Sequence, residues 1–321
     1  MQRKMNTKIR EKEEAQKIKE SSLWKDALYR LMRNKMAVIG GFIVIALCLI
    51  AIFAPFIAPY PYDVGNFWDN YARPGTKYLL GADFMGRDLL SRIIYGTRVS
   101  LSVGLVGATV SFVIGIIYGL ISGYAGGKVD NYMMRIVDIA YGIPTLLLVI
   151  LLMVYFKSSF VSIKPGTFAG MLSSIDNALG GMFFIFVGIG ITSWLGMARL
   201  VRGMTLSLKE KEFIESARAV GVSNFRIIFH HILPNIIGPC IVNQALNIPS
   251  YILFEAFLSF IGLGVNPPTP SWGMMISEGY QGMRSYPHLV LFPALALSIT
   301  MFAFNFLGDG LRDALDPHAK L

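Results

Sequence analysis

The stretch EFIESARAVGVSNFRIIFHHILP, residues 212–234, carries a charge every few residues in a chain that is otherwise mostly apolar. Hydrophobic residues make up 54% of the 321-residue chain and charged residues only 15%. Soluble domains average about 25% charged residues. The composition therefore predicts a membrane protein. The charged stretch is unusual in such a protein and needs an explanation.

The stretch is expected to form two short helices joined at a glycine. Residues 207–210 (SLKE) have the spacing of a capping box, which predicts that the first helix begins near Leu208. Gly221 stands where a helix end favours a left-handed residue, Ser223 is positioned to cap the second helix, and Pro234 is expected to end it. The apolar stripes of the two helices are Phe213, Ile214, Ala217 and Val220, and Phe225, Ile228, Phe229 and Ile232.

Helices of about 10 residues are not stable alone, so the apolar faces of this hairpin need a partner. The membrane surface is one candidate, and the ends of the chain's own helices are another. Glu212 and Glu215 would face anionic lipid headgroups on a membrane surface, which is unfavourable for a lipid anchor. The acidic residues therefore favour a protein partner that has a groove and basic residues.

Six apolar segments are long enough to cross a membrane, which requires about 20 helical residues. They are expected at residues 36–59, 99–124, 133–156, 179–200, 236–262 and 288–307. The predicted fold class is therefore an all-α membrane protein with six transmembrane helices. Recurring glycines in the first, second and fourth segments favour close packing between helices.

The distribution of Lys and Arg predicts that both the N-terminus and the C-terminus lie in the cytosol. With this orientation 21 Lys and Arg fall in the inside segments, which are residues 1–35, 125–135, 199–234 and 308–321. Only 8 fall in the outside segments, which are residues 60–98, 157–178 and 263–287. The basic tail at the start is expected to lie on anionic lipid rather than on nucleic acid, because a membrane span follows it directly. The charged hairpin is predicted to be cytosolic.

Few polar residues interrupt the six spans. Arg135 and Asp138 are expected to pair with each other or with neighbouring helices, and a role in substrate contact is the alternative. Glu255 is either a gate or external contact, or a carboxylate paired with another helix. Four amides, Asn243, Gln244, Asn247 and Asn305, either line a pathway or make interhelical hydrogen bonds.

The sequence contains no recognisable catalytic motif. A P-loop, an HExxH zinc site, a G-x-S-x-G turn and an EF-hand loop are all absent from it. His230 and His231 point about 100° apart on a helix, so they cannot bind one metal ion together. The chain is therefore not expected to be an enzyme, and it is expected to hold no metal or cofactor.

The hairpin resembles the EAA loop of the membrane subunits of binding-protein-dependent ABC importers, whose pattern is E-A-A-x3-G-x9-I-x-L-P. The matching residues are Glu215, Ala217, Gly221, Leu233 and Pro234, and the departures are Ser216 for the first of the two alanines and His231 for the isoleucine. In that family the first helix of the loop is a coupling helix, which sits in a groove of a separate ATP-hydrolysing subunit. The resemblance therefore implies ATPase coupling by residues 212–221, including Glu212 and Arg218, and accounts for the missing P-loop.

Two further stretches resemble the peptide and nickel importer permeases of the C type. The stretch LGADFMGRDLLSRIIYGTRVSLSVG, residues 80–104, contains an amphipathic helix before the second span, and its acidic and basic residues are spaced for the i,i+4 ion pairs Asp83–Arg87 and Asp88–Arg92. The stretch EAFLSFIGLGVNPPTPSWGMMISEG, residues 255–279, is an outer loop stiffened by prolines. Docking of a binding protein, or a gate, is expected at Asp83, Arg87, Asp88, Arg92, Glu255, Pro267, Pro268 and Trp272.

The resemblance implies the type I permease fold of ABC importers and a chain of five parts. These are a basic cytosolic tail at 1–35, a first transmembrane helix at 36–59, an extracytoplasmic loop at 60–98, a five-helix core at 99–309 with the EAA loop at 207–234, and a cytosolic tail at 310–321. The expected partners are a second homologous permease, two subunits that bind ATP and Mg, an extracytoplasmic solute-binding protein and membrane lipid, without nucleic acid.

The function that the resemblance implies is the import of di- or oligopeptides across the cytoplasmic (inner) membrane of a prokaryote. Nickel chelates or another small solute are the alternative cargo within the same class of importer. A secondary transporter or channel is the alternative from another class, and it would need ion-coupling groups or an inverted repeat, neither of which is evident in the sequence.

Overall fold

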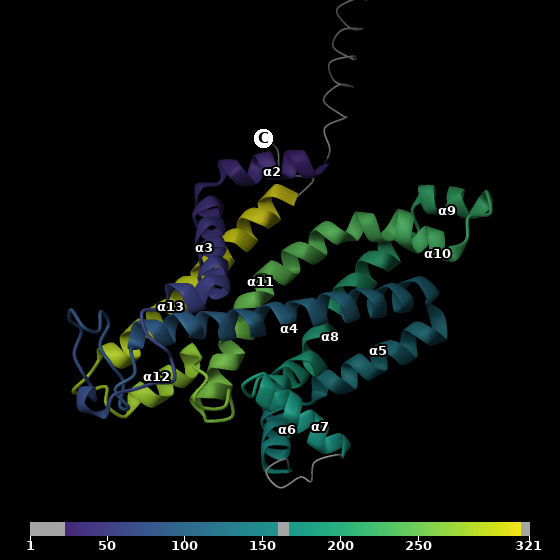
Figure 1. Ribbon diagram of the computed structural model, residues 1–321. Coiled ribbons are helices and arrows are strands. Elements are labelled where there is room, and N and C mark those ends of the chain that lie inside the picture. The colour runs from purple at the N-terminus through teal and green to yellow at the C-terminus, as the bar shows by residue number, and fades with distance from the viewer. Residues whose placement is uncertain (1–22, 160–166, 316–321) are drawn as a thin grey trace, which may run out of the picture.

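The computed structural model describes residues 23–159 and 167–315 of the chain (Figure 1). Within these ranges the fold is helical, and the one strand-like pairing is an isolated β-bridge between Ala82 and Asp88. The elements are α2 (Leu23–Arg33), α3 (Lys35–Ile57), η1 (Phe67–Asp69), α4 (Leu89–Ala125), α5 (Gly127–Gly142), α6 (Thr145–Ser159), α7 (Phe168–Ala178), α8 (Phe183–Lys209), α9 (Glu212–Ala219), α10 (Asn224–Arg226), η2 (Ile227–Ile232), α11 (Leu233–Phe260), α12 (Trp272–Tyr280) and α13 (His288–Leu315).

Five helices are long and apolar enough to cross a membrane, namely α3, α4, α8, α13 and the continuous helix from Asn224 to Phe260. The predicted third span is instead a bent pair, α5 and α6, whose axes differ by 78°. The prediction of one unbroken helix at 133–156 is therefore wrong. The break lies at Ile143, which is extended (φ −91°, ψ 123°) because the ring of Pro144 disfavours helical geometry in the residue before it. The described residues thus contain five spans, or six if the bent pair crosses as one.

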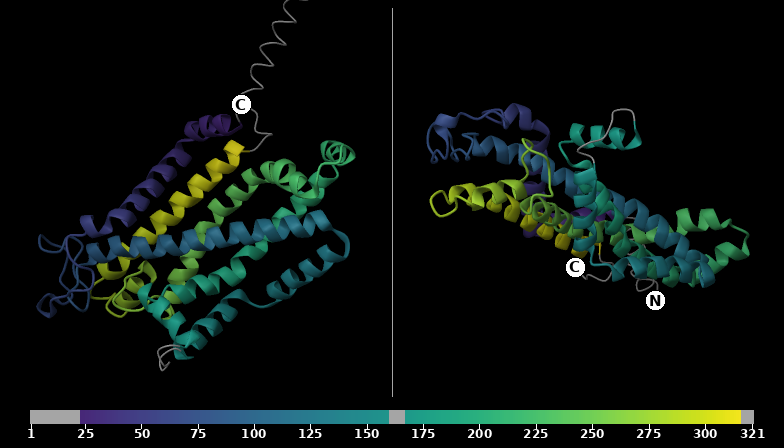
Figure 2. Two further views of the ribbon diagram at one scale, coloured as in Figure 1. Left: turned by 45° about the vertical axis from the view of Figure 1, so that its right-hand side comes forward. Right: turned by 90° about the horizontal axis from the view of Figure 1, so that it is seen from below.

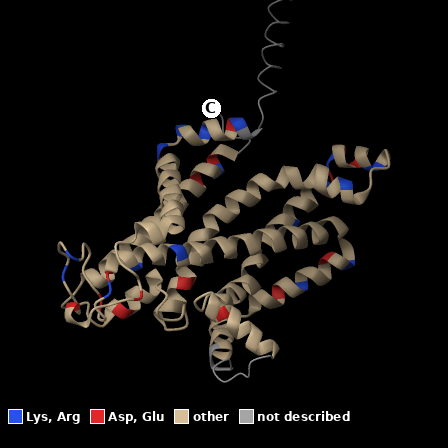
Figure 3. Ribbon diagram, viewed as in Figure 1, with Lys and Arg blue, Asp and Glu red and all other residues tan. Residues whose placement is uncertain are grey.

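The helices α4 and α8 form the centre of the molecule, and α3 lies beside α13 on one flank (Figures 1 and 2). Residues 60–88 and α12 gather at the start of α4, which we call the loop end, and α9 and α10 lie near its other end, which we call the hairpin end. Because α4 has 37 residues, the two ends are about 55 Å apart. Most charged residues lie at these ends and in α2, as Figure 3 shows.

Three glycines, Gly115, Gly119 and Gly123, allow α4 and α8 to approach closely. A Cβ atom at Gly119 would lie 2.6 Å from the carbonyl oxygen of Ala198 and 2.6 Å from the Cβ of Val201. Small residues spaced four apart are the usual means by which membrane helices bring their backbones together. The structure thus confirms the close packing that the glycines of the second predicted span indicated.

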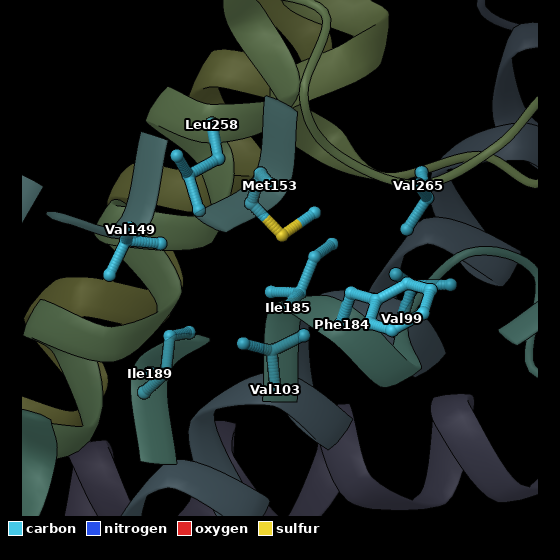
Figure 4. Close-up of a cluster of buried hydrophobic side chains, with 9 residues drawn as sticks. All are labelled: Val99, Val103, Val149, Met153, Phe184, Ile185, Ile189, Leu258 and Val265. Atoms are coloured by element: carbon cyan, nitrogen blue, oxygen red, sulfur yellow. The ribbon is translucent and has the colours of Figure 1, made fainter. Parts of the chain in front are cut away.

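A cluster of nine buried side chains holds the bent pair against the centre of the molecule (Figure 4). It joins side chains of α4, α6, α8, α11 and the segment after α11, namely Val99, Val103, Val149, Met153, Phe184, Ile185, Ile189, Leu258 and Val265. The two members from α6 point into the same interior as those from α8 in Figure 4. The position of α6 is therefore fixed by apolar packing after the chain has bent at Pro144.

Candidate functional site

The hairpin begins later than its sequence predicts. Residues 207–210 do not start a new helix, because α8 continues to Lys209 and α9 begins only at Glu212. The predicted capping box is therefore wrong. Met204 and Leu208 of α8 pack against the buried cluster beneath the hairpin, and this packing extends α8 beyond the predicted start.

The first helix of the hairpin, α9, ends at a left-handed glycine, as predicted. Gly221 has a φ of +84°, and its N–H donates to the carbonyl of Arg218 at 2.9 Å. The N–H of Val222 donates to the carbonyl of Ala217 at 3.0 Å. These two bonds form a Schellman motif, which satisfies carbonyls at a helix C-terminus. The turn of the hairpin is therefore specified by the chain itself.

The second half of the hairpin is continuous with a membrane span. α10 and η2 run into α11, and Pro234 lies in the first turn of α11 instead of ending a helix as predicted. The N–H of Leu233 donates to the carbonyl of Ile228, five residues back, which is the π-helical pattern. A proline ring clashes with the carbonyl four residues back in a regular helix, and the wider turn of η2 relieves that clash.

A buried cluster anchors the hairpin to three spans. Ile214, the one fully buried side chain of α9, belongs to a cluster with residues of α4, α8, η2 and α11. The buried members of the cluster are Ile116, Leu120, Met197, Val201, Ile214, Ile227, Ile232, Ile236 and Cys240. Burial of one such aliphatic side chain stabilises the fold by about 1.5–3 kcal/mol. α9 is therefore attached to the ends of all three spans and not tethered by its flanking loops alone.

The two predicted apolar stripes divide between the interior and the surface. Ile214 and Ile232 pack inside, whereas Val220 is 85% exposed and Phe225 is 70% exposed. Phe229 is also exposed, and its ring packs on that of Phe225 with 4.4 Å between centroids. The hairpin thus buries one part of its apolar surface against the rest of the chain, and the other part is exposed and available to a partner.

Most residues to which the resemblance gives ATPase coupling lie on the outer surface of the hairpin. Ala217 and Leu233 are partly buried, and the exposed residues are Glu212, Glu215, Ser216, Arg218, Gly221 and Pro234. Both glutamates lie in the first turn of α9, where the helix dipole favours negative charge. The structure thus brings together on α9 the acidic residues, Ser216 and Arg218, with Leu233 and Pro234 at the base of the hairpin.

Tyr124, in the last turn of α4, contacts both arms of the hairpin, and the sequence analysis missed it. Its hydroxyl donates to Oδ1 of Asn224 at 2.7 Å, and the guanidinium of Arg218 lies 5.3 Å from its ring centroid. Lys209 adds a second link, because its Nζ donates to the carbonyl of Gly123 at 3.1 Å. The sequence signal for Tyr124 is an aromatic residue with a polar tip at the end of an apolar span.

An ion pair joins the same ends of α4, α5 and α8. Arg202 donates from Nε and Nη2 to the two carboxylate oxygens of Asp130, each at 2.6 Å. The hydroxyl of Ser122 donates to the same carboxylate at 2.5 Å. Bidentate pairs of this kind fix geometry as well as charge. Asp130 and Arg202 each lie at the edge of an apolar segment. They are 72 positions apart, so helical periodicity in the sequence does not predict that they pair.

At the loop end, the structure confirms one predicted ion pair and corrects the other. Nε of Arg87 donates to Asp83 at 2.7 Å. Asp88 does not pair with Arg92, because its carboxylate caps α4 by accepting from the N–H and hydroxyl of Ser91 at 2.8 and 2.6 Å. Arg92 instead bonds to Asp83 and, from α12, to Glu278. The predicted Asp88–Arg92 pair is therefore wrong.

Burial limits what the residues predicted for docking can do. Asp83, Arg87, Asp88, Arg92, Glu255 and Trp272 are all buried, so they offer no surface to a binding protein. Pro267 and Pro268 are exposed. The expectation of docking at the six buried positions is therefore corrected, and a gating role for any of the eight stays a prediction.

Glu255 and Trp272 link three helices at the loop end. Glu255 accepts from the hydroxyl of Ser259 at 2.6 Å and from that of Ser100 at 3.2 Å, so it is held by hydroxyls of α11 and α4. Nε1 of Trp272 donates to the carbonyl of Ile93 at 3.2 Å. The indole lies in the packed interior and not at the surface. Both residues serve packing between α4, α11 and α12.

Exposed aromatic residues mark a different surface at the loop end. Trp68, in η1, is 96% exposed, and Phe67 beside it is exposed as well. The same turn carries Asp69, which accepts from Nζ of Lys77 at 2.5 Å, and this contact holds the pKa of Asp69 below its usual value. Tyr78 also donates to Asp69, and burial raises the pKa of its hydroxyl. Large exposed aromatic side chains of this kind are common at binding surfaces.

Two family models match this chain. The one described as binding-protein-dependent transport system inner membrane component matches residues 115–321. The one described as N-terminal TM domain of oligopeptide transport permease C matches residues 22–74. The first match contains the whole hairpin, and the second contains η1 with its exposed aromatic residues.

Curated relatives align over nearly the whole chain. The oligopeptide transport system permease protein OppC of Bacillus subtilis is 42% identical, covering 96% of this chain and 94% of its own length. OppC of Haemophilus influenzae is 44% identical, covering 92% of this chain and 89% of its own length. The dipeptide transport system permease protein DppC of Bacillus subtilis is 40% identical, covering 96% of this chain and 90% of its own length.

The fold also has a solved counterpart. A chain of the MetNI methionine ABC transporter, in an inward facing conformation, aligns with a TM-score of 0.53 and 20% identity over 71% of this chain and 98% of that chain. The long apolar helices and these relatives make the chain a multi-pass protein of the bacterial inner membrane, in a family of transport permeases rather than enzymes. The chain belongs to the family of binding-protein-dependent transport system inner membrane components.

Proposed function

We propose that this chain is one permease subunit of an ATP-driven importer that carries di- or oligopeptides into the cytosol. Support for the cargo comes from the relatives that are named for oligopeptide and dipeptide transport and cover nearly the whole chain. In this proposal the chain pairs with a second, homologous permease, and two separate subunits bind ATP and Mg and hydrolyse the ATP. A binding protein outside the membrane delivers the peptide to the loop end.

The observation that carries the proposal is the hairpin α9–α10, which is rigid at its base and open at its surface. Its turn is closed by a Schellman motif at Gly221, and Ile214 fixes α9 to three spans. Its outer face combines carboxylates at Glu212 and Glu215 with exposed apolar side chains. A surface with these properties fits the groove of a basic or mixed protein partner better than it fits anionic lipid.

The geometry provides a route by which a partner can move the spans. A displacement of α9 acts on α4 through Tyr124, because this side chain holds both Arg218 and Asn224. It acts on α8 and α11 through the buried cluster around Ile214. Since α4 and α8 are closely packed along three glycines, they are expected to move as a unit, while the bend at Pro144 gives α5 and α6 a separate hinge.

The proposed orientation has six spans with both termini in the cytosol. The bent pair α5 and α6 then crosses once, and the hairpin and the basic helix α2 lie on the same side. Figure 3 supports this orientation, because the Lys and Arg of α2 and of the hairpin lie toward the top of the view and residues 60–88 lie toward the lower left. Positive charge concentrated on one side is the usual mark of the cytosolic face.

Reconstitution of the complete importer in proteoliposomes tests the proposal. Gly221→Pro removes the left-handed turn, because proline fixes φ near −65° and has no N–H for Arg218. Glu215→Lys reverses an exposed charge on α9. Both variants are expected to reduce ATP-dependent peptide uptake by about tenfold or more, a loss equivalent to about 1.4 kcal/mol of coupling free energy.

The matched control is Asp63→Lys, which makes the same change of charge on an exposed residue at the loop end. It is expected to leave ATPase binding unchanged, whereas the two hairpin variants lose bound ATPase or lose stimulation of ATP hydrolysis by the loaded binding protein. Normal uptake by both hairpin variants, with a normal amount of bound ATPase, would contradict the coupling role. Uptake of a nickel chelate without uptake of peptides would replace the proposed cargo.

A further inference from the structure

A polar cavity of about 390 Å³ lies between α4, α5, α6, α8 and α11. Its volume falls in the range of about 300–1,000 Å³ that is typical of small-ligand sites. Asn243 and Asn247 line it from the middle of α11, and Thr192 and Ser193 line it from the middle of α8. The cavity therefore lies at the depth of the membrane interior, far from both the hairpin and the outer loop.

The lining of the cavity combines polar and apolar side chains and carries no charge. None of the described residues that form it is Asp, Glu, Lys, Arg or His. Its polar groups are hydroxyls and amides, and the non-aromatic ones belong to Ser111, Thr145, Thr192, Ser193, Asn243, Asn247 and Ser250. Such groups donate and accept hydrogen bonds at the same site, which is what a neutral amide ligand requires.

The structure separates the amides that join helices from those that face the cavity. Nε2 of Gln244 donates to the hydroxyl of Ser111 at 2.7 Å, so this amide links α11 to α4. Nδ2 of Asn247 donates to the carbonyl and to Oδ1 of Asn243, at 2.8 and 3.0 Å, within α11 itself. Asn305 is exposed on α13 and does not line the cavity. The two cavity amides therefore contribute nothing to the joining of helices.

These groups retain unused hydrogen-bonding capacity. Asn243 accepts from Asn247 through its carbonyl and its Oδ1, so its Nδ2 group keeps its donors, and the buried hydroxyl of Ser193 has no partner among the described residues. Polar groups without partners are costly inside a membrane. Their concentration around one cavity points to a polar ligand that completes their hydrogen bonds.

One ion pair lies beside the cavity. Asp138 bonds to Arg199 of α8 at 2.5 Å. Of the two partners that the sequence suggests, Arg135 or a neighbouring helix, the structure shows the second. The guanidinium of Arg199 also lies 4.0 Å from the ring centroid of Tyr141, whose side chain lines the cavity. The ion pair therefore adds no net charge to this side of the cavity, and the site stays electrically neutral.

We propose that the peptide in transit contacts this subunit in the cavity and is recognised there through its backbone amides. The inference rests on the proposed function as a peptide importer. Peptides that differ in their side chains share only the backbone N–H and C=O groups, and the side-chain amides of Asn243 and Asn247 complement those groups. A neutral lining does not discriminate between basic and acidic peptides, so selection by charge is left to other parts of the importer.

The test introduces one charge into the cavity and measures a ratio. Asn247→Asp is nearly isosteric, and Asn305→Asp makes the same change on a span outside the cavity. The complete importer with its binding protein is reconstituted, and uptake of Ala-Lys-Ala is compared with uptake of Ala-Glu-Ala at pH 7 and at pH 9. The cavity variant is expected to raise the ratio of basic to acidic peptide by about tenfold relative to the original chain, because a unit charge a few ångströms away acts strongly in a partly desolvated site.

The ratio does not depend on the amount of importer that assembles, and Asn243→Asp provides a second variant if Asn247→Asp fails to assemble. A shift in the ratio for a cavity variant, with none for Asn305→Asp, supports the inference. An unchanged ratio in an active cavity variant at both pH values overturns it. Absence of peptide uptake by the original importer would overturn the proposed function itself, which distinguishes the two failures.

Discussion

Arg92 shows how a single side chain can be misread from its spacing. It lies four positions after Asp88, but its guanidinium reaches Asp83 and Glu278, the second of which is 186 positions away. Asp88 is unavailable because it caps the helix that carries Arg92. The side chain of Arg92 is 1% exposed, so its charge depends on these partners and not on water. The network therefore ties the loop that carries Asp83 to α4 and α12.

Removal of Arg92 should destabilise the protein strongly. Arg92→Met leaves Asp83 and Glu278 with less compensation in a buried site, and loss of one partner from a buried pair costs about 3–5 kcal/mol. The measurement is the thermal unfolding midpoint of the purified protein in detergent. Arg98→Met is the control, because Arg98 is exposed on the same helix. Equal midpoints for the two variants would contradict a structural role for the network.

Tyr124 provides a finer test of the hairpin base. Tyr124→Phe keeps the ring under Arg218 but removes the hydrogen bond to Asn224, which is worth about 0.5–1.5 kcal/mol. Amide hydrogen exchange across residues 212–226 is expected to become about threefold to tenfold faster, in proportion to this free energy. Tyr132→Phe, at an exposed position on α5, is expected to change nothing. Exchange that stays at the original rate would show that the hydroxyl does not hold the hairpin.

Helix ends that are determined by neighbouring residues could be predicted from the sequence. Helix ends that are determined by contacts with distant residues could not. Gly221 could be assigned because a helix end and its left-handed residue are adjacent in sequence. The end of α8 could not, because Met204 and Leu208 are kept helical by a cluster that includes residues of α4 and α11. The break at Pro144 had a local signal in its proline, but the apolar run through it favoured one span. Asn243 and Asn247 could be named as candidates for a pathway, but the cavity itself could not be predicted, since five helices have to assemble before its polar residues meet.

The glycine contact between α4 and α8 should tolerate no added methyl group. Gly119→Ala places a Cβ atom 2.6 Å from the carbonyl oxygen of Ala198, a distance at which backbone must move. The expected loss of stability is about 1–3 kcal/mol, which is typical of overpacking. Gly203→Ala is the control, because a Cβ atom there meets nothing within 4 Å. Detergent unfolding curves that agree for the two variants would argue against close packing at Gly119.

In the whole molecule, the long helices connect the hairpin end with the loop end, and the uncharged cavity lies between them. The hairpin end presents a preformed surface anchored by Ile214, and the loop end presents exposed aromatic residues around Trp68. Between them, α4 is one continuous helix packed on α8, so a movement at one end has a rigid path to the other. The bend at Pro144 and the cavity beside it lie along this path. This arrangement is suited to a transport cycle driven from outside the chain.

The most direct test of this arrangement is site-specific crosslinking of α9 to the ATPase subunit. Cys48 and Cys240 are replaced by Ser, and Ser216→Cys is introduced on the exposed face of α9, with Thr76→Cys at the loop end as the control. In the assembled importer, a short thiol crosslinker is expected to join the α9 variant to the ATPase subunit and the loop variant to the binding protein or to nothing. If the α9 variant assembles and transports normally yet yields no crosslink to the ATPase, while the loop variant yields one, the assignment of the hairpin as the coupling site is contradicted.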